Sequence, residues 1–237
     1  MKEIKKYAEQ WNSSASYFYE KSFYSWMADK LSEYSTILEL GCGTGYSTLA
    51  LIEKGFKVLA VDKNIDCISK AKELLLNKGI NDSQVIFIEG DIADENFRKN
   101  LISSYAFDVV ACWNIGSYWS KEMMQYYLPH MLEYGLNVQQ IKENPESSYS
   151  ELIIWEVCRL AKAKNVPAHI VDRGTEIISE KNDPYYYTLK SEFGYAEILY
   201  DNLCADSISN GGRVLTTNGT VNMSEKIDIV FTSILVR

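Results

Sequence analysis

Short apolar runs alternate with segments of helical periodicity along the first half of the chain. Four of these runs predict β-strands, at residues 36–40, 57–62, 84–88 and 107–112. Gly55 and Gly79 follow the first two helical segments, and glycine often ends a helix because it adopts the left-handed conformation without steric cost. This alternation is typical of a parallel sheet covered by helices.

The alternation of apolar runs and helical segments is less regular in the second half of the chain. A fifth apolar run lies at residues 168–171, and two helical patterns, at 121–134 and 149–163, occupy the long interval before it. A crossover between parallel strands usually needs one helix, so we expect a helical insertion here. Runs at 196–203 and 227–236 predict closing strands, and Asn218-Gly219 between them predicts a hairpin.

Composition narrows the classes of partner. The chain of 237 residues carries 24 Lys and Arg against 32 Asp and Glu, a net charge of −8, which argues against nucleic acid as the main partner. Its five cysteines are widely spaced without a C-x-x-C pair, so we expect no disulfide framework, no metal site and a reduced, cytoplasmic location. No signal peptide or membrane-spanning run is expected, because no apolar run is long enough.

A glycine-rich turn joins the first predicted strand to the first helix. Its sequence, Gly41-Cys42-Gly43-Thr44-Gly45, leaves backbone N–H groups open to a ligand at the start of a helix. Dinucleotide sites use G-x-G-x-x-G, with a third glycine that packs the helix on the strand. Tyr46 stands at that third position, which argues against a nicotinamide cofactor.

Residues 37–45, ILELGCGTG, resemble motif I of the class I S-adenosylmethionine-dependent methyltransferases, and the resemblance extends over residues 36–113. It implies S-adenosylmethionine as cofactor. It also implies that Asp62 binds the ribose hydroxyls and that Asp91, with the backbone of Ile92, binds the adenine. We expect the remaining cofactor contacts from Glu39, Gly41, Gly43, Gly45, Lys63 and Trp113. A carboxylate is a natural bidentate acceptor for two neighbouring hydroxyls, which supports the role of Asp62 independently.

The candidate catalytic residues lie after the fourth strand, within the fifth strand or at its end. They are Asn114, Tyr118, His169 and Asp172. His169 could equally be a satisfied core histidine, and Asp172 could belong to a salt bridge. Methyl transfer can proceed by direct displacement, so a general base is needed only where the acceptor must lose a proton early. We expect the acceptor pocket between residues 113 and 163, with Trp113, Asn114, Tyr118 and Trp119 as its floor.

The first 26 residues are rich in aromatic side chains, and Tyr7, Trp11 and Tyr17 are candidates for a lid over the cofactor. An aromatic face can attract a sulfonium or a cationic amine. The alternative is a helix that packs its aromatic face on the sheet.

These expectations combine into one α/β domain, residues 1–237, with a Rossmann-like sheet of seven mostly parallel strands. The last strand is antiparallel, helices cover both faces, and the helical insertion lies between strands four and five. Its four parts are an aromatic lid (1–34), a cofactor-binding core (35–119), the insertion (120–166) and a C-terminal half with the hairpin extension (167–237).

The predicted function is methyl transfer to an oxygen or nitrogen of a small-molecule acceptor. Two alternatives stay open: a methyltransferase acting on RNA or protein, and a non-catalytic cofactor-binding module. The hairpin leaves a homodimer open as well.

Overall fold

The computed structural model describes residues 2–80, 82–116, 120–183, 185–208 and 226–237. The strands are β1 (Thr36–Leu40), β2 (Lys57–Asp62), β3 (Val85–Glu89), β4 (Val109–Trp113), β5 (Ala168–Gly174), β6 (Ile198–Ile208) and β7 (Lys226–Val236). The α-helices are α1 (Lys2–Glu20), α2 (Phe23–Asp29), α3 (Tyr46–Glu53), α4 (Ile65–Asn77), α5 (Glu95–Ser104), α6 (Lys121–Tyr134), α7 (Val138–Glu143), α8 (Pro145–Lys164) and α9 (Tyr186–Phe193). Among these helices, none has the length and apolar character that crossing a bilayer needs.

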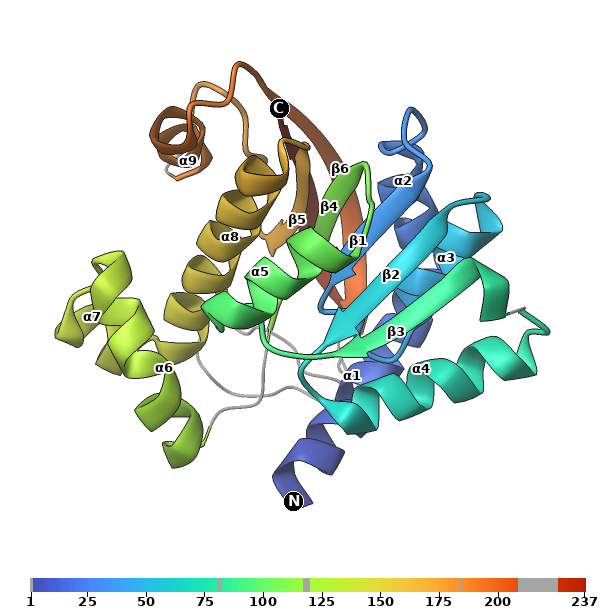
Figure 1. Cartoon of the computed structure of the whole chain (residues 1–237). Helices are drawn as coiled ribbons and strands as arrows, with labels where there is room; N and C mark the ends of the chain where they lie inside the picture. The colour runs from blue at the N-terminus through green and yellow to red at the C-terminus, as the bar shows by residue number, and fades with distance from the viewer. Residues whose placement is uncertain (1, 81, 117–119, 184, 209–225) are drawn as a thin grey trace.

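The strands form one seven-stranded sheet in the order β3-β2-β1-β4-β5-β7-β6 (Figure 1). Neighbouring pairs from β3 to β5 are parallel, and β7 runs antiparallel to both β5 and β6. The predicted Rossmann-like sheet with an antiparallel last strand is therefore confirmed. All the parallel strands end at the same edge, where ligands of open α/β sheets bind.

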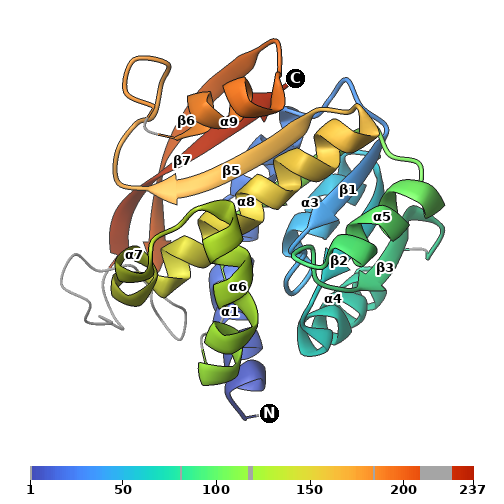
Figure 2. The ribbon, with the colours of Figure 1, turned by 60° about the vertical axis from the view of Figure 1, so that its left-hand side comes forward.

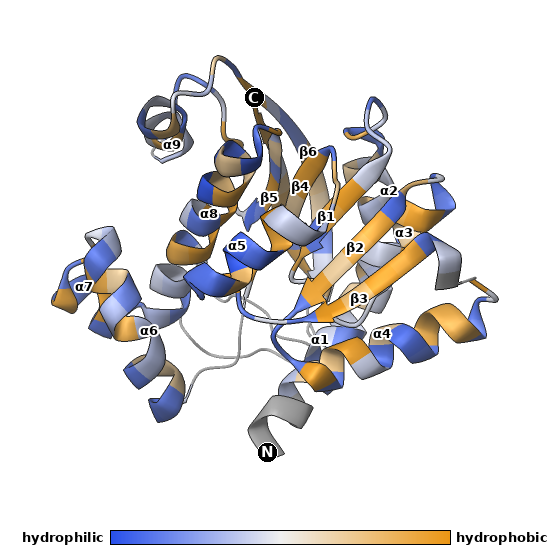
Figure 3. Cartoon of the chain, viewed as in Figure 1, coloured by the Kyte–Doolittle hydropathy of each residue, from blue (hydrophilic) through white to orange (hydrophobic). Residues whose placement is uncertain are grey.

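Helices cover both faces of the sheet, as Figures 1 and 2 show from two sides. Alternate residues of a strand point to opposite faces, so Ile37 and Leu38 of β1 enter two different buried clusters. Residues of α1 to α4 pack in the cluster of Ile37, and residues of α5 to α9 in that of Leu38. The central strands are apolar along their length while the helices are mixed, which is typical of strands buried on both faces (Figure 3).

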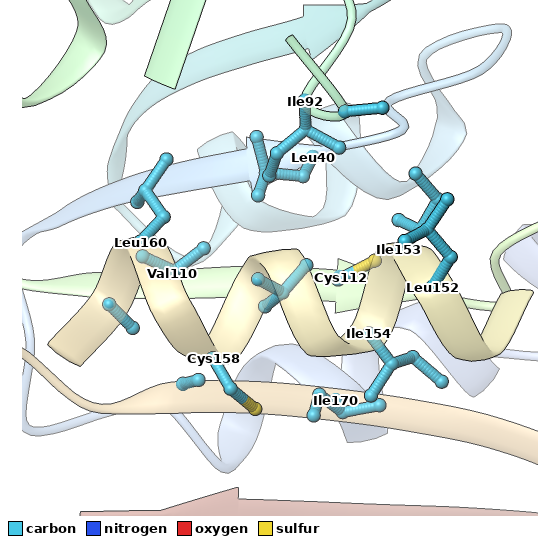
Figure 4. Close-up of a cluster of buried hydrophobic side chains, with 14 of the residues drawn as sticks. Leu40, Ile92, Val110, Cys112, Leu152, Ile153, Ile154, Cys158, Leu160 and Ile170 are labelled. Atoms are coloured by element: carbon cyan, nitrogen blue, oxygen red, sulfur yellow. The ribbon is translucent and has the colours of Figure 1, made fainter. Parts of the chain in front are cut away.

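The interval between β4 and β5 holds three helices, one more than the sequence predicts. The long helix α8 lies against the sheet, where Ile154 and Cys158 pack beside Val110 and Ile170 (Figure 4). It is therefore the crossover helix, and α6 with α7 form the extra layer. The helix expected from residue 149 begins earlier, at Pro145, because the Asn144 side chain accepts a hydrogen bond from the Ser147 N–H at the start of α8.

Several boundaries differ from the predicted ones. Trp113 ends β4 rather than following it, and β5 continues to Gly174, so Asp172 pairs with Thr232 of β7 inside the sheet. The helices α5, α7 and α9 were not predicted. The predicted hairpin at Asn218-Gly219 lies outside the described residues.

Candidate functional site

The glycine turn between β1 and α3 is built from left-handed backbone. Gly41, Gly43 and Gly45 have φ of +78°, +53° and +89°. A side chain would also collide with close neighbours: a Cβ at Gly43 would lie 2.6 Å from Trp11 Nε1, and one at Gly45 would lie 2.7 Å from the Ala71 Cβ. The turn therefore requires glycine both for its conformation and for the packing of α1 and α4 against it.

Asp62, at the end of β2, holds this turn in place. Its Oδ2 accepts a hydrogen bond from the Gly43 N–H at 2.9 Å, and its Oδ1 accepts one from the Asn64 N–H at 2.8 Å. Burial raises the pKa of Asp62, and the two backbone donors oppose that rise. A carboxylate offers about four lone-pair sites, so two acceptor positions remain for a ligand.

Two adjoining cavities lie at the carboxyl ends of the strands. The first is lined by Tyr7, Trp11, Gly41, Gly43, Asp62, Lys63, Asn64, Cys67, Asn114, Ile115 and Gly116. The second is lined by Leu40, Gly41, Val61, Asp62, Lys63, Gly90, Asp91, Ile92, Ile115, Gly116, Tyr149 and Ile153. Because five residues are common to both, the two cavities form one elongated site from β4 to β3.

A polar network joins Lys63 and Asp91, which line the second cavity, to Tyr127 of α6. Lys63 Nζ donates to the Tyr127 hydroxyl at 3.1 Å and lies 4.7 Å and 4.1 Å from the ring centroids of Tyr127 and Tyr149. The Tyr127 hydroxyl donates in turn to Asp91. Burial lowers the pKa of Lys63 to about 8, and the charges of Asp91 and Asp62 oppose this. The insertion thus contacts the predicted adenine-binding carboxylate through α6.

Asn114, which lines the first cavity, has a strained backbone and an amide without a hydrogen-bond partner among the described residues. It has φ of +53°, and its backbone N–H donates to the Val171 carbonyl at 2.8 Å. Both polar atoms of its amide are buried, and neither has a hydrogen-bond partner among the described residues. An unsatisfied buried amide and a strained backbone each cost about 1–3 kcal/mol. Such a residue is typical of a site that awaits a ligand.

Glu39 lies behind the glycine turn, in the middle of the sheet. Its side chain is 2% exposed, and its Oε2 accepts a hydrogen bond from the Thr48 hydroxyl at 2.6 Å. Burial raises the pKa of Glu39 to about 7, and the hydroxyl groups of Ser47 and Thr48 oppose this.

We expect this shift to make the stability of the protein pH-dependent. The ordinary pKa of Glu39 is 4.5 and the folded-state value is about 7, so between these values the folded protein binds more protons than the unfolded chain. The free energy of unfolding should therefore fall as pH rises through this window, and Glu39→Gln should flatten the fall. Urea denaturation of both proteins from pH 5 to 8 measures the two slopes. Equal slopes would contradict the raised pKa.

The segment of the chain that contains this site resembles known proteins. Residues 37–134 match the family described as methyltransferase domain, which spans the glycine turn, Asp62, Asp91 and Asn114. This segment, 98 of the 237 residues, is similar to a methyltransferase domain. S-adenosylmethionine is the methyl donor of the class I methyltransferases, and the glycine turn and the remaining acceptor positions of Asp62 fit such a ligand.

Two curated relatives and one solved structure show how far the likeness extends. The chain is 40% identical over 75 residues to cypemycin N-terminal methyltransferase of a Streptomyces species and 32% identical over 69 residues to YqeM of Bacillus subtilis (strain 168). These matches cover 32% and 29% of this chain and 26% of each relative. The crystal structure of EvdMO1 covers 90% of this chain at a TM-score of 0.51 and 14% identity, and the match covers 40% of that protein.

The two cavities include most residues predicted to bind the cofactor. Gly41, Gly43, Asp62, Lys63, Asp91 and Ile92 all line them. Gly45 lies in the turn and packs against Ala71, and Glu39 is buried behind the turn and bonded to Thr48, so neither lines the two cavities. Trp113 lines neither of the two cavities; it stacks on Tyr24 at 6.4 Å between ring centroids.

Of the three catalytic candidates that the structure describes, only Asn114 lines one of the two cavities. His169 is fully buried: Trp113 Nε1 donates to its Nδ1 at 2.9 Å, so its own proton lies on Nε2, 2.8 Å from the Ser233 hydroxyl. Burial lowers its pKa to about 3, as in a satisfied core histidine. Asp172 accepts a hydrogen bond from the Tyr186 hydroxyl at 3.0 Å. Tyr118 and Trp119 lie outside the described residues.

The predicted lid divides into two parts. Tyr7 and Trp11 line the first cavity, whereas Phe18 and Tyr24 are buried in the core, where Phe18 meets Phe231 edge-on at 5.1 Å. Tyr17 packs on the same core and lines neither cavity.

Two further groups of residues at the site were not predicted from the sequence. Ile115 and Gly116 extend the wall beyond Asn114, which their position after the fourth strand could have suggested. Tyr127 and Tyr149 were missed because their partner Lys63 lies 64 residues before Tyr127. No local pattern pairs residues at that separation.

Proposed function

We propose that this chain transfers the methyl group of S-adenosylmethionine to an oxygen or nitrogen of a small-molecule acceptor. The observation that carries the proposal is Asn114, which lines the cavity beside the glycine turn and whose buried amide has no partner among the described residues. A protein tolerates that arrangement where a ligand completes the hydrogen bonds.

The second cavity suits the nucleoside of the cofactor. We propose that the two remaining acceptor positions of Asp62 bind the ribose hydroxyls and that Asp91 accepts from the adenine amino group. Asp91 retains acceptor capacity, because its Oδ1 accepts from the Ala93 N–H at 2.9 Å and its Oδ2 from Tyr127. The apolar side chains of Ile92 and Ile153 border the space for the ring.

The first cavity then receives the methionine end, and the acceptor approaches past Asn114. When bound, the cofactor supplies an activated methyl group that leaves by direct displacement. The chain contributes orientation: Asn114 can accept from or donate to the acceptor and hold it in line. We propose no general base from His169, since both its ring nitrogens are engaged in the core.

Two sets of measurements test the function. Calorimetry should show binding of S-adenosylmethionine and S-adenosylhomocysteine but not of NAD. A screen with radiolabelled S-adenosylmethionine should then label small amines or alcohols in preference to peptides with a free N-terminus and to tRNA. The peptides belong in this panel because one relative is named an N-terminal methyltransferase.

The outcomes separate the remaining alternatives. Labelling of peptide or tRNA alone would replace the small-molecule acceptor by a macromolecular one. Cofactor binding without transfer to any acceptor would favour a non-catalytic binding module. The cytoplasmic location and a homodimer stay predictions.

A further inference from the structure

Two aromatic side chains of α1 form one wall of the first cavity. Tyr7 and Trp11 are four residues apart, so they lie on the same side of the helix. Both line the cavity, together with Gly43, Asn114 and Gly116. The first turns of α1 extend past the edge of the sheet at which β1 and β2 end (Figure 1).

Trp11 is held firmly against the glycine turn. A Cβ at Gly43 would lie 2.6 Å from its Nε1 and 2.9 Å from its Cδ1, so the indole rests where a side chain would otherwise be. The ring of the buried Phe18 meets it edge-on, with 6.5 Å between centroids. An indole fixed in this way offers a large aromatic surface at little cost in conformational entropy.

The charged groups near this wall have other roles. Lys63 Nζ lies 4.7 Å and 4.1 Å from the ring centroids of Tyr127 and Tyr149. Asp62 accepts hydrogen bonds from two backbone N–H groups, and its two remaining acceptor positions are assigned above to the ribose. The aromatic groups of the first cavity that can meet a cation are Tyr7 and Trp11, and Trp11 is the one that packs on Gly43.

Resting on the methyl-transfer function proposed above, we infer that Trp11 recognises the positive charge of the sulfonium and so distinguishes the methyl donor from its neutral product. With the nucleoside at Asp62 and Asp91, the sulfur of the cofactor falls in the first cavity. Tryptophan has the strongest cation–π attraction of the aromatic residues. The attraction is present for S-adenosylmethionine and absent for S-adenosylhomocysteine, which otherwise makes the same contacts.

Calorimetry with the two ligands tests this directly on the whole chain. Trp11→Leu should weaken the binding of S-adenosylmethionine by about 2- to 30-fold more than the binding of S-adenosylhomocysteine. Trp11→Phe should give an intermediate ratio, and it decides the question if the leucine variant does not fold. Trp26→Leu is the matched control: Trp26 of α2 also packs on this core and lies under Lys30, but it lines neither cavity.

The outcomes keep the two hypotheses apart, because binding of both ligands is read without any acceptor. A larger loss for S-adenosylmethionine supports charge recognition by Trp11. Equal losses for both ligands, or no loss, would overturn it and leave the methyl-transfer function intact. A wild-type chain that binds neither ligand would overturn the proposed function itself.

Discussion

Replacing Asp62 by alanine should lower the affinity for S-adenosylmethionine at least tenfold. Two charge-assisted hydrogen bonds to the ribose would be lost, each worth ~1.5–3 kcal/mol. The glycine turn should also loosen, because the Gly43 N–H loses its acceptor. Calorimetric titration of the folded variant measures the loss.

Asp94→Ala separates the two causes. The Asp94 side chain accepts from the N–H groups of Asn96 and Phe97 at the start of α5, is exposed and lines neither cavity. Both variants should lose comparable stability in a thermal melt, by ~0.5–2 kcal/mol for a lost cap. The Asp62 variant alone should lose cofactor affinity. An unchanged dissociation constant for it would remove Asp62 from the site.

The sheet could be predicted because its signals are local. Apolar runs of strand length with glycine-ended helices between them fix β1 to β4 to within about two residues. The helix α5 was missed because its apolar positions are few: of its ten residues only Arg98 and Leu101 are buried. Arg98 is buried because it forms an ion pair with Glu156 of α8 at 3.1 Å. No local sequence pattern predicts a contact between residues so far apart in the chain.

The predicted site residues also divide into those that local signals determine and those that they do not. Asp62 and the glycines could be assigned because the backbone around them requires those residue types. Trp113 was chosen for its position after the fourth predicted strand and His169 for its residue type, and neither criterion tells which face of the sheet a side chain enters. Both point to the side of α1 and α2, where they bond each other. A shift of one position along a strand reverses that face.

Replacing Asn114 by alanine should reduce kcat/KM for methyl transfer by about 10²-fold or more, while the affinity for S-adenosylmethionine stays within a few-fold. Loss of one preorganised polar group at the reacting centre commonly costs 10²–10³ in rate. The folded protein should not lose a hydrogen bond with it, because the amide makes none among the described residues. Single-turnover kinetics with the acceptor found in the screen, beside calorimetry for the cofactor, measure the two effects.

Backbone strain at Asn114→Ala is a second explanation for a loss of activity. Two further variants separate it from the loss of the amide. Asn114→Gly deletes the same amide at a position where φ of +53° costs glycine nothing, so it should be as inactive as the alanine variant. Asn165→Ala imposes the equivalent strain elsewhere, at an exposed asparagine with φ of +58° that ends α8, and should leave transfer unchanged. If Asn114→Gly retained full turnover, or both Asn114 variants changed only the oligomeric state, Asn114 would not contact the acceptor, and the pocket would have to lie elsewhere along the sheet edge.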